Sequence, residues 1–402
     1  MNRMTLNQKE AHLKTKKIVW IGNIPDYYLA KMAKIEILVA LAKQDHSISL
    51  ITPNPSVRHR TKDSRIEAIS IPLKSLRVIS QMMFDVVLFF FLPIYILTSR
   101  PDFIITTTDG TIFGFLPTVL FKKLGFKLVL DIRSTPVTRA GSRGFIRNLC
   151  FNASVSIAKK RFDGITIITS LMKKEVCKRF AIEPSKVGVW TEGVSTELFK
   201  SERYAHERKM LSESLGLSDS FVVLYHGAFS PMRGIIECVK AMSIVKQSRS
   251  TIVLFLLGTG PMVNELRTLL QGEKVQDNVI LHGAVNYEDV PKYIAMSDVG
   301  IVPLPNIPFW RYQCPLKLLE YLAMKKVVII TDIPAHRNIV RNKECGIYIS
   351  STNPEEIAKA IIHAYENRDK LEKCGASGRE IVINDYRWEK VAKDLESYLL
   401  SL

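Results

Sequence analysis

Short runs of branched apolar residues recur along this chain of 402 residues, and stretches with helical spacing separate them. Runs that are apolar throughout, instead of alternating, are typical of parallel strands buried on both faces. The runs therefore predict an α/β protein with two doubly wound sheets. We expect strands at 17–22, 47–52, 66–71, 103–108, 127–132, 164–169 and 186–191, and then at 221–227, 251–258, 279–283, 299–304, 327–332 and 346–350.

A polar, charge-rich stretch separates the two series of strands and predicts a domain boundary. We expect a polar tail over 1–16 and a first Rossmann-like domain over 17–198. A linker over 199–220 leads to a second Rossmann-like domain over 221–385. The last segment, 386–402, is expected to form a helix that crosses back to the first domain.

The chain is strongly basic, with 56 Lys and Arg against 39 Asp and Glu and a net charge of +17. Fourteen basic and three acidic residues fall between Phe121 and Phe180. Such a patch attracts a polyanion: nucleic acid, an anionic membrane surface or a phosphorylated substrate. A solvated basic face without a partner is the alternative. The interleaved aromatic residues and modules typical of nucleic-acid binding are not found, so we expect no nucleic acid as partner.

An apolar segment, Val86–Thr98, is too short to span a bilayer, which takes about 20 residues. We expect a helix pair or a helix kinked at Pro93 over 73–98. Either it is a core helix, or its apolar face dips into a membrane surface. The N-terminus lacks the apolar core of a signal peptide, and the six cysteines show no paired spacing. We therefore expect a cytoplasmic protein, peripheral on the inner face of the membrane.

Common cofactor and metal motifs are absent from the sequence. The stretch LGTGP at 257–261 resembles a dinucleotide fingerprint, but Val263 occupies the position of the third glycine. No DxD, HxxxH or HExxH motif occurs. We therefore expect no bound cofactor and no metal.

The stretch YHGAFSPMRGI at 225–235 is the first candidate binding loop. Ligands of doubly wound sheets bind at the carboxyl ends of the strands. Here a strand ends at Gly227, and Arg233 with Gly234 opens a helix. A helix N-terminus offers free N–H groups, and an arginine fork can grip phosphate. A tight turn with an exposed arginine is the simpler interpretation.

The stretch CPLKLLEYLAMKK at 314–326 is the second candidate. Pro315 suits the first helical position, which would leave the N–H groups of Leu316, Lys317 and Leu318 free to face an anion. Glu320 lies on the same helical face as Lys317 and could accept hydrogen bonds from a ribose diol. The spacing suits a nucleotide diphosphate. An ordinary Lys–Glu surface ion pair is the alternative.

Together these stretches, with VILHGAV and SDVGIVPL, resemble retaining GT-B glycosyltransferases of the GT4-like type, the glycosyl transferases group 1. The resemblance is clearest over Thr166–Asp332. It implies the GT-B architecture, in which two Rossmann-like domains face a central cleft. It also implies a nucleotide-sugar donor held by the C-terminal domain, and a metal-independent transfer that retains the anomeric configuration.

The resemblance also implies roles for single residues. Arg233 and Lys317 would bind the diphosphate and carry catalysis, and Glu320 would hold the ribose. Asp109 and Arg133 are further candidates for catalysis near the cleft, and neither is assigned as a base. Gly22 and Asn23 would form the acceptor loop. The donor-binding residues would be Gly227, Arg233, Gly258, Gly283, Val285, Pro315, Leu316, Lys317, Leu318 and Glu320.

The sequence also departs from the family pattern. Tyr312 stands where the first of two glutamates is common, and Ala228 where an arginine is common. The sugar is therefore not predicted. We expect a nucleotide-sugar donor, a glycan or lipid-linked acceptor and an anionic membrane surface as partners, in surface polysaccharide biosynthesis. A nucleotide-sugar epimerase, a basic nucleic-acid-binding protein and an inactive membrane scaffold are the alternatives.

Overall fold

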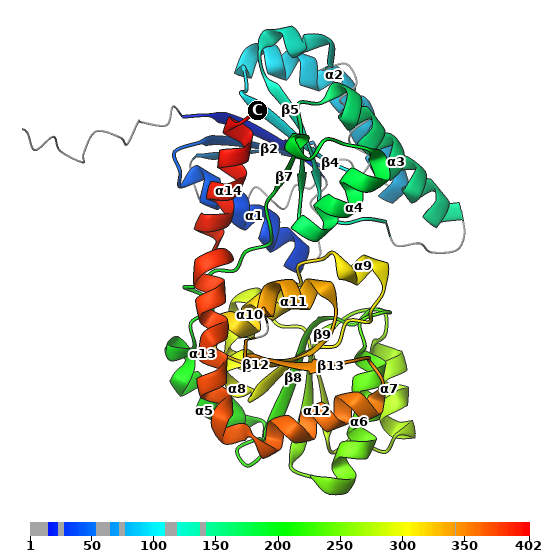
Figure 1. Cartoon of the computed structure of the whole chain (residues 1–402), viewed down its shortest axis with the longest axis vertical. Coiled ribbons are helices and arrows are strands. Elements are labelled where there is room, and N and C mark those ends of the chain that lie inside the picture. The colour runs from blue at the N-terminus through cyan, green and yellow to red at the C-terminus, as the bar shows by residue number, and fades with distance from the viewer. Residues whose placement is uncertain are drawn as a thin grey trace, which may run out of the picture. The chain divides into compact units, whose positions relative to one another are not determined.

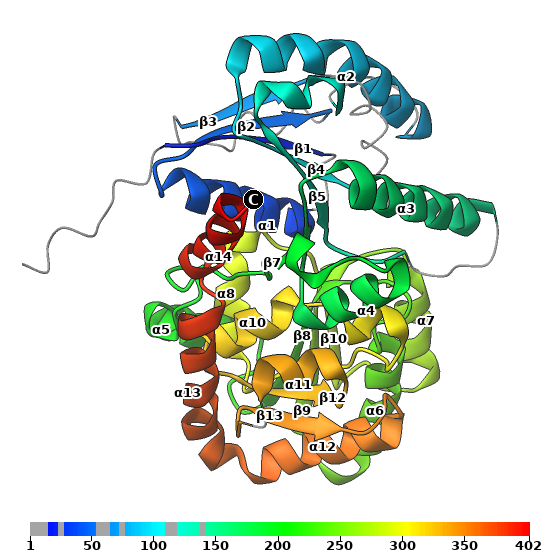
Figure 2. The same ribbon diagram turned by 45° about the horizontal axis from the view of Figure 1, so that its top comes forward.

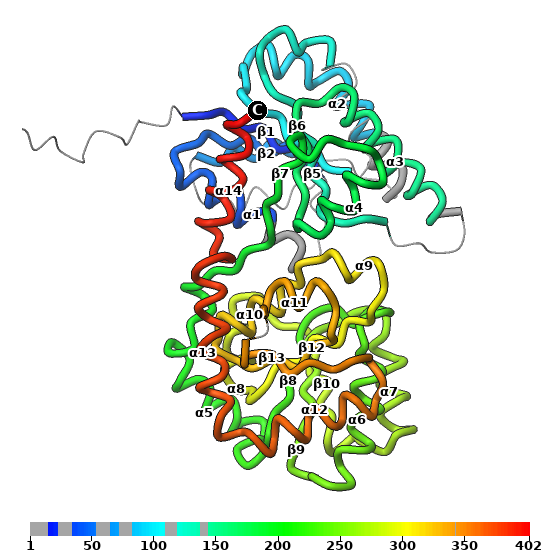
Figure 3. The backbone as a smooth tube through the Cα atoms, viewed as in Figure 1, coloured from blue at the N-terminus to red at the C-terminus, as the bar shows by residue number. Residues whose placement is uncertain are grey.

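A computed structural model describes residues 15–22, 28–53, 65–71, 77–108, 119–136, 142–341 and 343–402 (Figures 1 and 3). The chain divides into two compact units. The first unit combines Met1–Thr166, Phe180–Gly188 and Leu395–Leu402. The second unit combines Ile167–Arg179 and Val189–Asp394.

The units differ from the predicted domain ranges at three places. Residues 167–179 and 189–198, predicted as part of the first domain, belong to the second unit. The stretch 199–220, predicted as a linker, belongs to the second unit. It forms a 3-10 turn, Ser201–Tyr204, and helix α5, Ala205–Ser214, which packs against α8, Val290–Met296. The C-terminal helix α14, Trp388–Leu400, begins in the second unit and ends in the first.

The first unit is built on a parallel sheet of seven strands in the order β3-β2-β1-β4-β5-β6-β7. Strand β1 lies between β2 and β4, with Trp20 opposite Leu50 and Ile105. All seven strands lie within the segments predicted as strands. They are β1 Lys17–Ile21, β2 Ser47–Thr52, β3 Ile66–Ser70, β4 Phe103–Thr107, β5 Lys127–Ile132, β6 Gly164–Ile167 and β7 Val187–Val189.

Helices cover both faces of this sheet, with α1, Tyr28–Ala42, and α2, Arg77–Ser99, on opposite faces (Figure 2). Helix α3, Ser142–Arg161, follows β5. Between β4 and β5, residues 119–124 form a short 3-10 helix.

Helix α2 is apolar on two sides. Phe84, Leu88, Leu92 and Ile96 recur every four residues and are fully buried, as expected for a helix face against a sheet. Pro93 lies inside this helix, which is continuous from Arg77 to Ser99 and not a helix pair. Its outward side chains are also apolar and exposed: Val86, Phe89, Phe90, Ile94 and Leu97. Among the described residues, no helix is long and apolar enough to cross a membrane.

The end of the chain completes the first unit. The Tyr398 hydroxyl donates to the Lys186 carbonyl at 2.6 Å and accepts the Ile165 N–H at 3.1 Å. Its ring covers Gly188, where a Cβ atom would lie 2.3 Å from it. The buried His46 Nε2 lies 2.9 Å from Glu396 Oε1. The last eight residues are therefore part of the core of this unit.

The second unit repeats the same topology, with six parallel strands in the order β10-β9-β8-β11-β12-β13. A large apolar cluster joins β8 and β9 to α6, Ile235–Ser248, and α12, Pro354–Glu366. The strands are β8 Phe221–Ala228, β9 Ile252–Thr259, β10 Val279–Gly283, β11 Val299–Val302, β12 Val327–Thr331 and β13 Gly346–Ile349. The remaining helices are α4 Ser170–Phe180, α7 Val263–Gly272, α9 Pro308–Arg311, α10 Leu316–Ala323, α11 Pro334–Val340 and α13 Arg368–Asp385.

Candidate functional site

The order of the strands marks one crevice in the second unit. Strands β8 and β11 are neighbours, and the connections that follow them leave in opposite directions along the sheet. Doubly wound sheets bind ligands at such a switch point, beyond the carboxyl ends of the strands. The loop after β8, which carries Arg233, and the start of α10, which carries Lys317, both lie at this edge.

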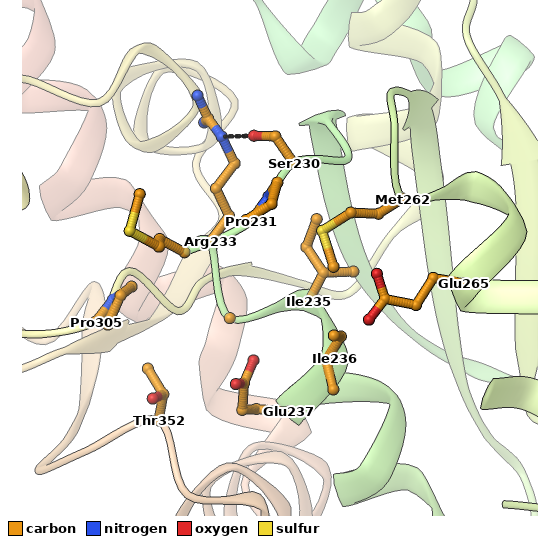
Figure 4. A pocket seen from close by; sticks show the side chains of 12 residues that line it. Ser230, Pro231, Arg233, Ile235, Ile236, Glu237, Met262, Glu265, Pro305 and Thr352 are labelled. Carbon is orange, nitrogen blue, oxygen red and sulfur yellow. Dashed lines mark hydrogen bonds between the residues drawn. The ribbon is translucent and has the colours of Figure 1, made fainter. Parts of the chain in front are cut away.

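Arg233 is held on a tight loop. Met232 and Gly234 on either side of it have φ angles of 62° and 71°, and a Cβ atom on Gly234 would lie 2.0 Å from the Pro303 carbonyl oxygen. The Arg233 Nε donates to Ser230 Oγ at 2.8 Å (Figure 4). The guanidinium Cζ lies 5.0 Å from the centre of the Trp310 ring. Arg233 is therefore oriented before any ligand binds, unlike the exposed arginine of a simple turn.

Lys317 is buried, with 8% of its surface exposed, and its Nζ lies 3.6 Å from the centre of the Tyr225 ring. This Nζ has no hydrogen-bond partner among the described residues. Burial holds the pKa of Lys317 well below its usual range, and the charge of Arg233 lowers it further. The Tyr225 hydroxyl donates to the Ala228 carbonyl at 3.2 Å. Burial raises the pKa of Tyr225 and the charge of Arg233 acts to lower it, so one tyrosine lies near both predicted phosphate ligands.

Glu320 is 1% exposed and faces a different set of side chains. Its Oε2 lies 3.4 Å from His226 Nε2, and Tyr287 donates a hydrogen bond to the carboxylate. Burial raises the pKa of Glu320 to about 7, although Tyr287 and Lys317 act to lower it. Burial and the charge of Lys317 both lower the pKa of His226. Because Lys317 and Glu320 have separate surroundings, the alternative of a simple surface ion pair is wrong.

Three buried polar atoms at this edge lack a hydrogen-bond partner among the described residues. They are Lys317 Nζ, Glu320 Oε1 and His226 Nε2. The 3.4 Å contact of His226 Nε2 with Glu320 Oε2 is not a hydrogen bond. Buried polar groups in folded proteins are nearly always hydrogen-bonded, so such atoms need an explanation. Their clustering at the switch point indicates a site that a polar ligand completes.

The start of α10 differs in two details from the prediction. Pro315 is the N-cap residue, with φ −70° and ψ 113°, and the helix begins at Leu316. The Leu318 N–H donates to the Pro315 carbonyl at 3.0 Å, so it is not free to face an anion. The predicted anion contact at this terminus therefore reduces to the N–H groups of Leu316 and Lys317.

The predicted glycines have different surroundings. Gly227 and Gly258 lie opposite each other on β8 and β9, and a Cβ atom on Gly258 would lie 1.9 Å from the Gly227 carbonyl oxygen. This packing requires glycine without any ligand. Gly283 has a φ of 92° with open space where a Cβ atom would lie, and Val285 is half-buried. A donor contact at these positions stays a prediction.

A pocket of about 210 Å³ adjoins the loop after β8 (Figure 4). Arg233, Ser230, Glu237, Met262 and Glu265 are among its lining residues, whereas Lys317 and Glu320 are not. This pocket therefore touches the candidate site at Arg233 and its hydrogen-bond partner Ser230. Within the described residues, no group of three or more His, Cys, Asp and Glu side chains could hold a metal ion.

The candidates of the first unit lie at the ends of its strands. Gly22 follows β1, and its N–H donates to the Ile51 carbonyl at 3.2 Å. Arg133 follows β5 and is half-buried, and the neighbouring Asp131 accepts a hydrogen bond from Thr166 Oγ1 at 2.8 Å. Asn23 and Asp109 lie outside the described residues. Their proposed roles stay predictions.

Four aromatic and hydroxyl side chains of the site were not predicted. Tyr225 and Ser230 lie inside the stretch 225–235, where only the glycines and the arginine indicated a binding role. Trp310 and Tyr287 lie far from that stretch in the sequence and contact Arg233 and Glu320. The available signal was a tryptophan in a short, proline-rich loop directly before the Lys317 stretch.

Residues 207–381 match the family model described as Glycosyl transferases group 1. An uncharacterized glycosyltransferase of Methanocaldococcus jannaschii is 23% identical over 66% of this chain and 67% of its own length. A GDP-mannose-dependent alpha-(1-6)-phosphatidylinositol monomannoside mannosyltransferase of Mycobacterium tuberculosis is 24% identical over 59% of this chain and 61% of its own length. The chain thus spans less than two thirds of the length of the second of these relatives.

The fold has a counterpart among solved structures. The crystal structure of Anabaena HepE in complex with UDP aligns with a TM-score of 0.75. The alignment covers 96% of this chain and 100% of that one, at 15% identity. At this identity the likeness shows the fold alone. It confirms the prediction of two parallel-sheet α/β domains in the GT-B architecture.

Proposed function

From the match of residues 207–381 to the glycosyl transferases group 1 family, we propose that this chain carries out a retaining transfer of a sugar from a nucleotide-diphosphate-sugar to a hydroxyl acceptor. The observation that carries the proposal is the set of three buried polar atoms without hydrogen-bond partners among the described residues, on Lys317, Glu320 and His226. An anionic, hydroxyl-rich ligand supplies what these atoms lack.

The diphosphate would bind between Arg233 and Lys317. Both side chains lie near Tyr225, so a diphosphate bound there would meet the fixed cation of Arg233 and the Lys317 amine, whose protonation a bound anion favours. Charge develops on the departing diphosphate as the sugar leaves, and cations fixed beforehand stabilise that charge. In this proposal the two side chains do this without a metal. The acceptor hydroxyl attacks the anomeric carbon on the face that the phosphate leaves, the bond from that carbon to the phosphate oxygen breaks, and the hydroxyl proton passes to a phosphate oxygen.

The ribose would bind at Glu320. Its Oε1 is a buried acceptor without a partner among the described residues, which two ribose hydroxyls could fill. Because the side chain is only 1% exposed, this contact requires a shift of the residues that cover it. The base would lie toward the end of β10, at Gly283 and Val285.

The relatives suggest both UDP and GDP as probes, since HepE was solved with UDP and the mycobacterial relative uses GDP-mannose. Calorimetry with each nucleotide tests the proposal. Arg233→Ala and Lys317→Met are expected to weaken binding about 10- to 100-fold, the loss of one charge-assisted hydrogen bond. The exposed Arg267→Ala and Lys240→Ala are matched controls in the same unit. Unchanged affinity in folded Arg233→Ala and Lys317→Met would refute the diphosphate assignment.

For the acceptor we propose a lipid-linked or surface-glycan intermediate at an anionic membrane, which the protein meets peripherally from the inner face. Exposed apolar side chains in the first unit support this. They lie on the outward side of α2, on the 3-10 helix 119–124 with Leu120 and Leu124, and on α3 with Phe145, Ile146 and Leu149. Exposed basic residues such as Lys123 and Arg147 accompany them. Apolar side chains flanked by cations suit an anionic bilayer surface.

Sedimentation with vesicles tests this docking. Wild type is expected to pellet with phosphatidylglycerol vesicles at low salt, and the double variant Phe90→Ser, Ile94→Ser to remain in the supernatant. Met210→Ser removes an equally exposed apolar side chain from the second unit and is the control. Equal pelleting of all three proteins would place the membrane contact elsewhere.

A further inference from the structure

We propose that Trp310 is a positioning residue that holds Arg233 in the orientation needed to bind the donor diphosphate. The inference rests on the proposed function, because it assigns Arg233 to the phosphate. Trp310 lies in α9, Pro308–Arg311, within the connection from β11 to α10. The family resemblance implies no role for a tryptophan there.

Trp310 contacts the arginine loop in two ways. Its Nε1 donates to the Met232 carbonyl at 2.7 Å, across 78 residues of sequence. The face of its ring lies against the guanidinium, with Arg233 Cζ 5.0 Å from the ring centre. The first contact fixes the backbone directly before Arg233, and the second fixes the far end of its side chain. An indole that only filled space would need neither contact.

The backbone at Met232 explains why such a fixed point is needed. Met232 has a φ of 62°, a conformation that costs a non-glycine residue free energy and persists only where its surroundings impose it. The hydrogen bond from Trp310 ends on the carbonyl of this same residue. Without it, we expect Met232 to relax toward negative φ and to turn Arg233 away from Tyr225.

The support under Trp310 is itself fixed. Arg311 Nε donates to Asn306 Oδ1 at 2.8 Å, and Thr169 Oγ1 donates to the Tyr312 carbonyl at 2.6 Å. The connection that carries Trp310 is thus tied on both sides of the indole. With 8% of its surface exposed, the indole has little freedom to rotate.

The contacts leave the guanidinium able to bind an anion. An arginine has five N–H donors, and Ser230 takes the one on Nε. A stacked aromatic face leaves the edge of the guanidinium plane open, where bidentate contacts to phosphate form. Trp310 therefore orients the fork without occupying its donors.

The experiment compares binding of UDP with uridine, and of GDP with guanosine, by calorimetry. Trp310→Leu removes both contacts and is expected to weaken binding of the preferred diphosphate about tenfold. Trp310→Phe keeps a ring but loses the N–H and is expected to weaken it about threefold. Binding of the nucleosides is expected to stay unchanged. Pro308→Ala, at an exposed position of the same helix, is the control for general disturbance.

A double variant separates positioning from packing. If Trp310 acts through Arg233, then Trp310→Leu combined with Arg233→Ala binds no more weakly than Arg233→Ala alone. Additive losses, or wild-type diphosphate affinity in folded Trp310→Leu, would overturn the inference while leaving the proposed function standing. If Trp310→Leu does not fold, Trp310→Phe decides. An Arg233→Ala variant with wild-type affinity would instead refute the diphosphate assignment itself.

Discussion

Lys317 illustrates how a site can work against the stability of the fold. In the unfolded chain its amine is protonated at neutral pH, whereas in the folded protein burial and Arg233 hold its pKa well below the usual range. Between the folded and the unfolded pKa the unfolded state binds more protons, so this residue lowers stability more as the pH falls toward the folded pKa.

We therefore expect Lys317→Met to be more stable than wild type while it binds diphosphate poorly. The gain in the free energy of unfolding should be larger at pH 7 than at pH 9. Urea unfolding at both pH values measures it. The exposed Lys240→Met in α6 should show no such dependence. If the gain in the free energy of unfolding of Lys317→Met grew with pH, the Lys317 amine would not be neutral in the folded protein.

The contribution of Glu320 to the free energy of unfolding is expected to change with pH in the opposite direction to that of Lys317. Its pKa is raised from 4.5 to about 7, so the folded state binds more protons than the unfolded state between these values. Its contribution to stability is present below pH 4.5 and is lost as the pH rises through 7. Glu320→Gln cannot titrate and should lose less stability than wild type between pH 5 and 8. The difference is on the order of 3 kcal/mol. Parallel pH profiles of the two proteins would show that Glu320 does not titrate there.

At the scale of elements, the close approach of β8 and β9 depends on glycine. A Cβ atom on Gly258 would overlap the Gly227 carbonyl, and its φ of 155° adds backbone strain. We expect Gly258→Ala to lower the free energy of unfolding by about 2 kcal/mol or more. Gly272→Ala, at the end of α7 with open space around its Cβ position, should change it by less than about 1 kcal/mol. Thermal unfolding compares the two. Similar losses in both would mean that β8 and β9 can separate.

The strands were predictable because their apolar runs are a local property of the sequence. Every predicted strand is present, with ends that differ by a few residues. The buried and exposed sides of α2 could not be predicted, because in an all-apolar run the sequence does not distinguish the side chains that face the sheet. The predicted start of α10 was wrong by one position, because proline fits both the N-cap and the first turn of a helix.

The site itself was predictable only in part. Arg233 and Lys317 stood out because charge at the carboxyl end of a strand is a local signal. Their shared neighbour Tyr225 lies 92 positions before Lys317, and only the pairing of β8 with β11 brings them together. Trp310 and Tyr287 depend on loop geometry in the same way. Long-range contacts of this kind are not encoded in any single stretch.

At the scale of the whole molecule, Tyr398 joins the C-terminal residues to β6 and β7 within the first unit. Tyr398→Ala would leave the Ile165 N–H and the Lys186 carbonyl without this hydroxyl and open a cavity over Gly188. We expect a loss of about 3–5 kcal/mol. Tyr398→Phe keeps the ring and should lose about 1–3 kcal/mol. Urea unfolding ranks the two. Equal, small losses would mean that the C-terminal residues are dispensable.

This contact also bears on how the protein is made. During synthesis the N-terminal strands leave the ribosome first, yet Leu395–Leu402, which belong to the same unit, are made after every strand of the second unit. Until Tyr398 is made, its ring cannot cover Gly188 and the Ile165 N–H lacks the Tyr398 hydroxyl as acceptor. All strands of the second unit have been made before the first unit is complete. The order of folding is therefore expected to run against the order of translation, and a nascent chain stalled before Leu395 should have a protease-resistant second unit and a sensitive first one.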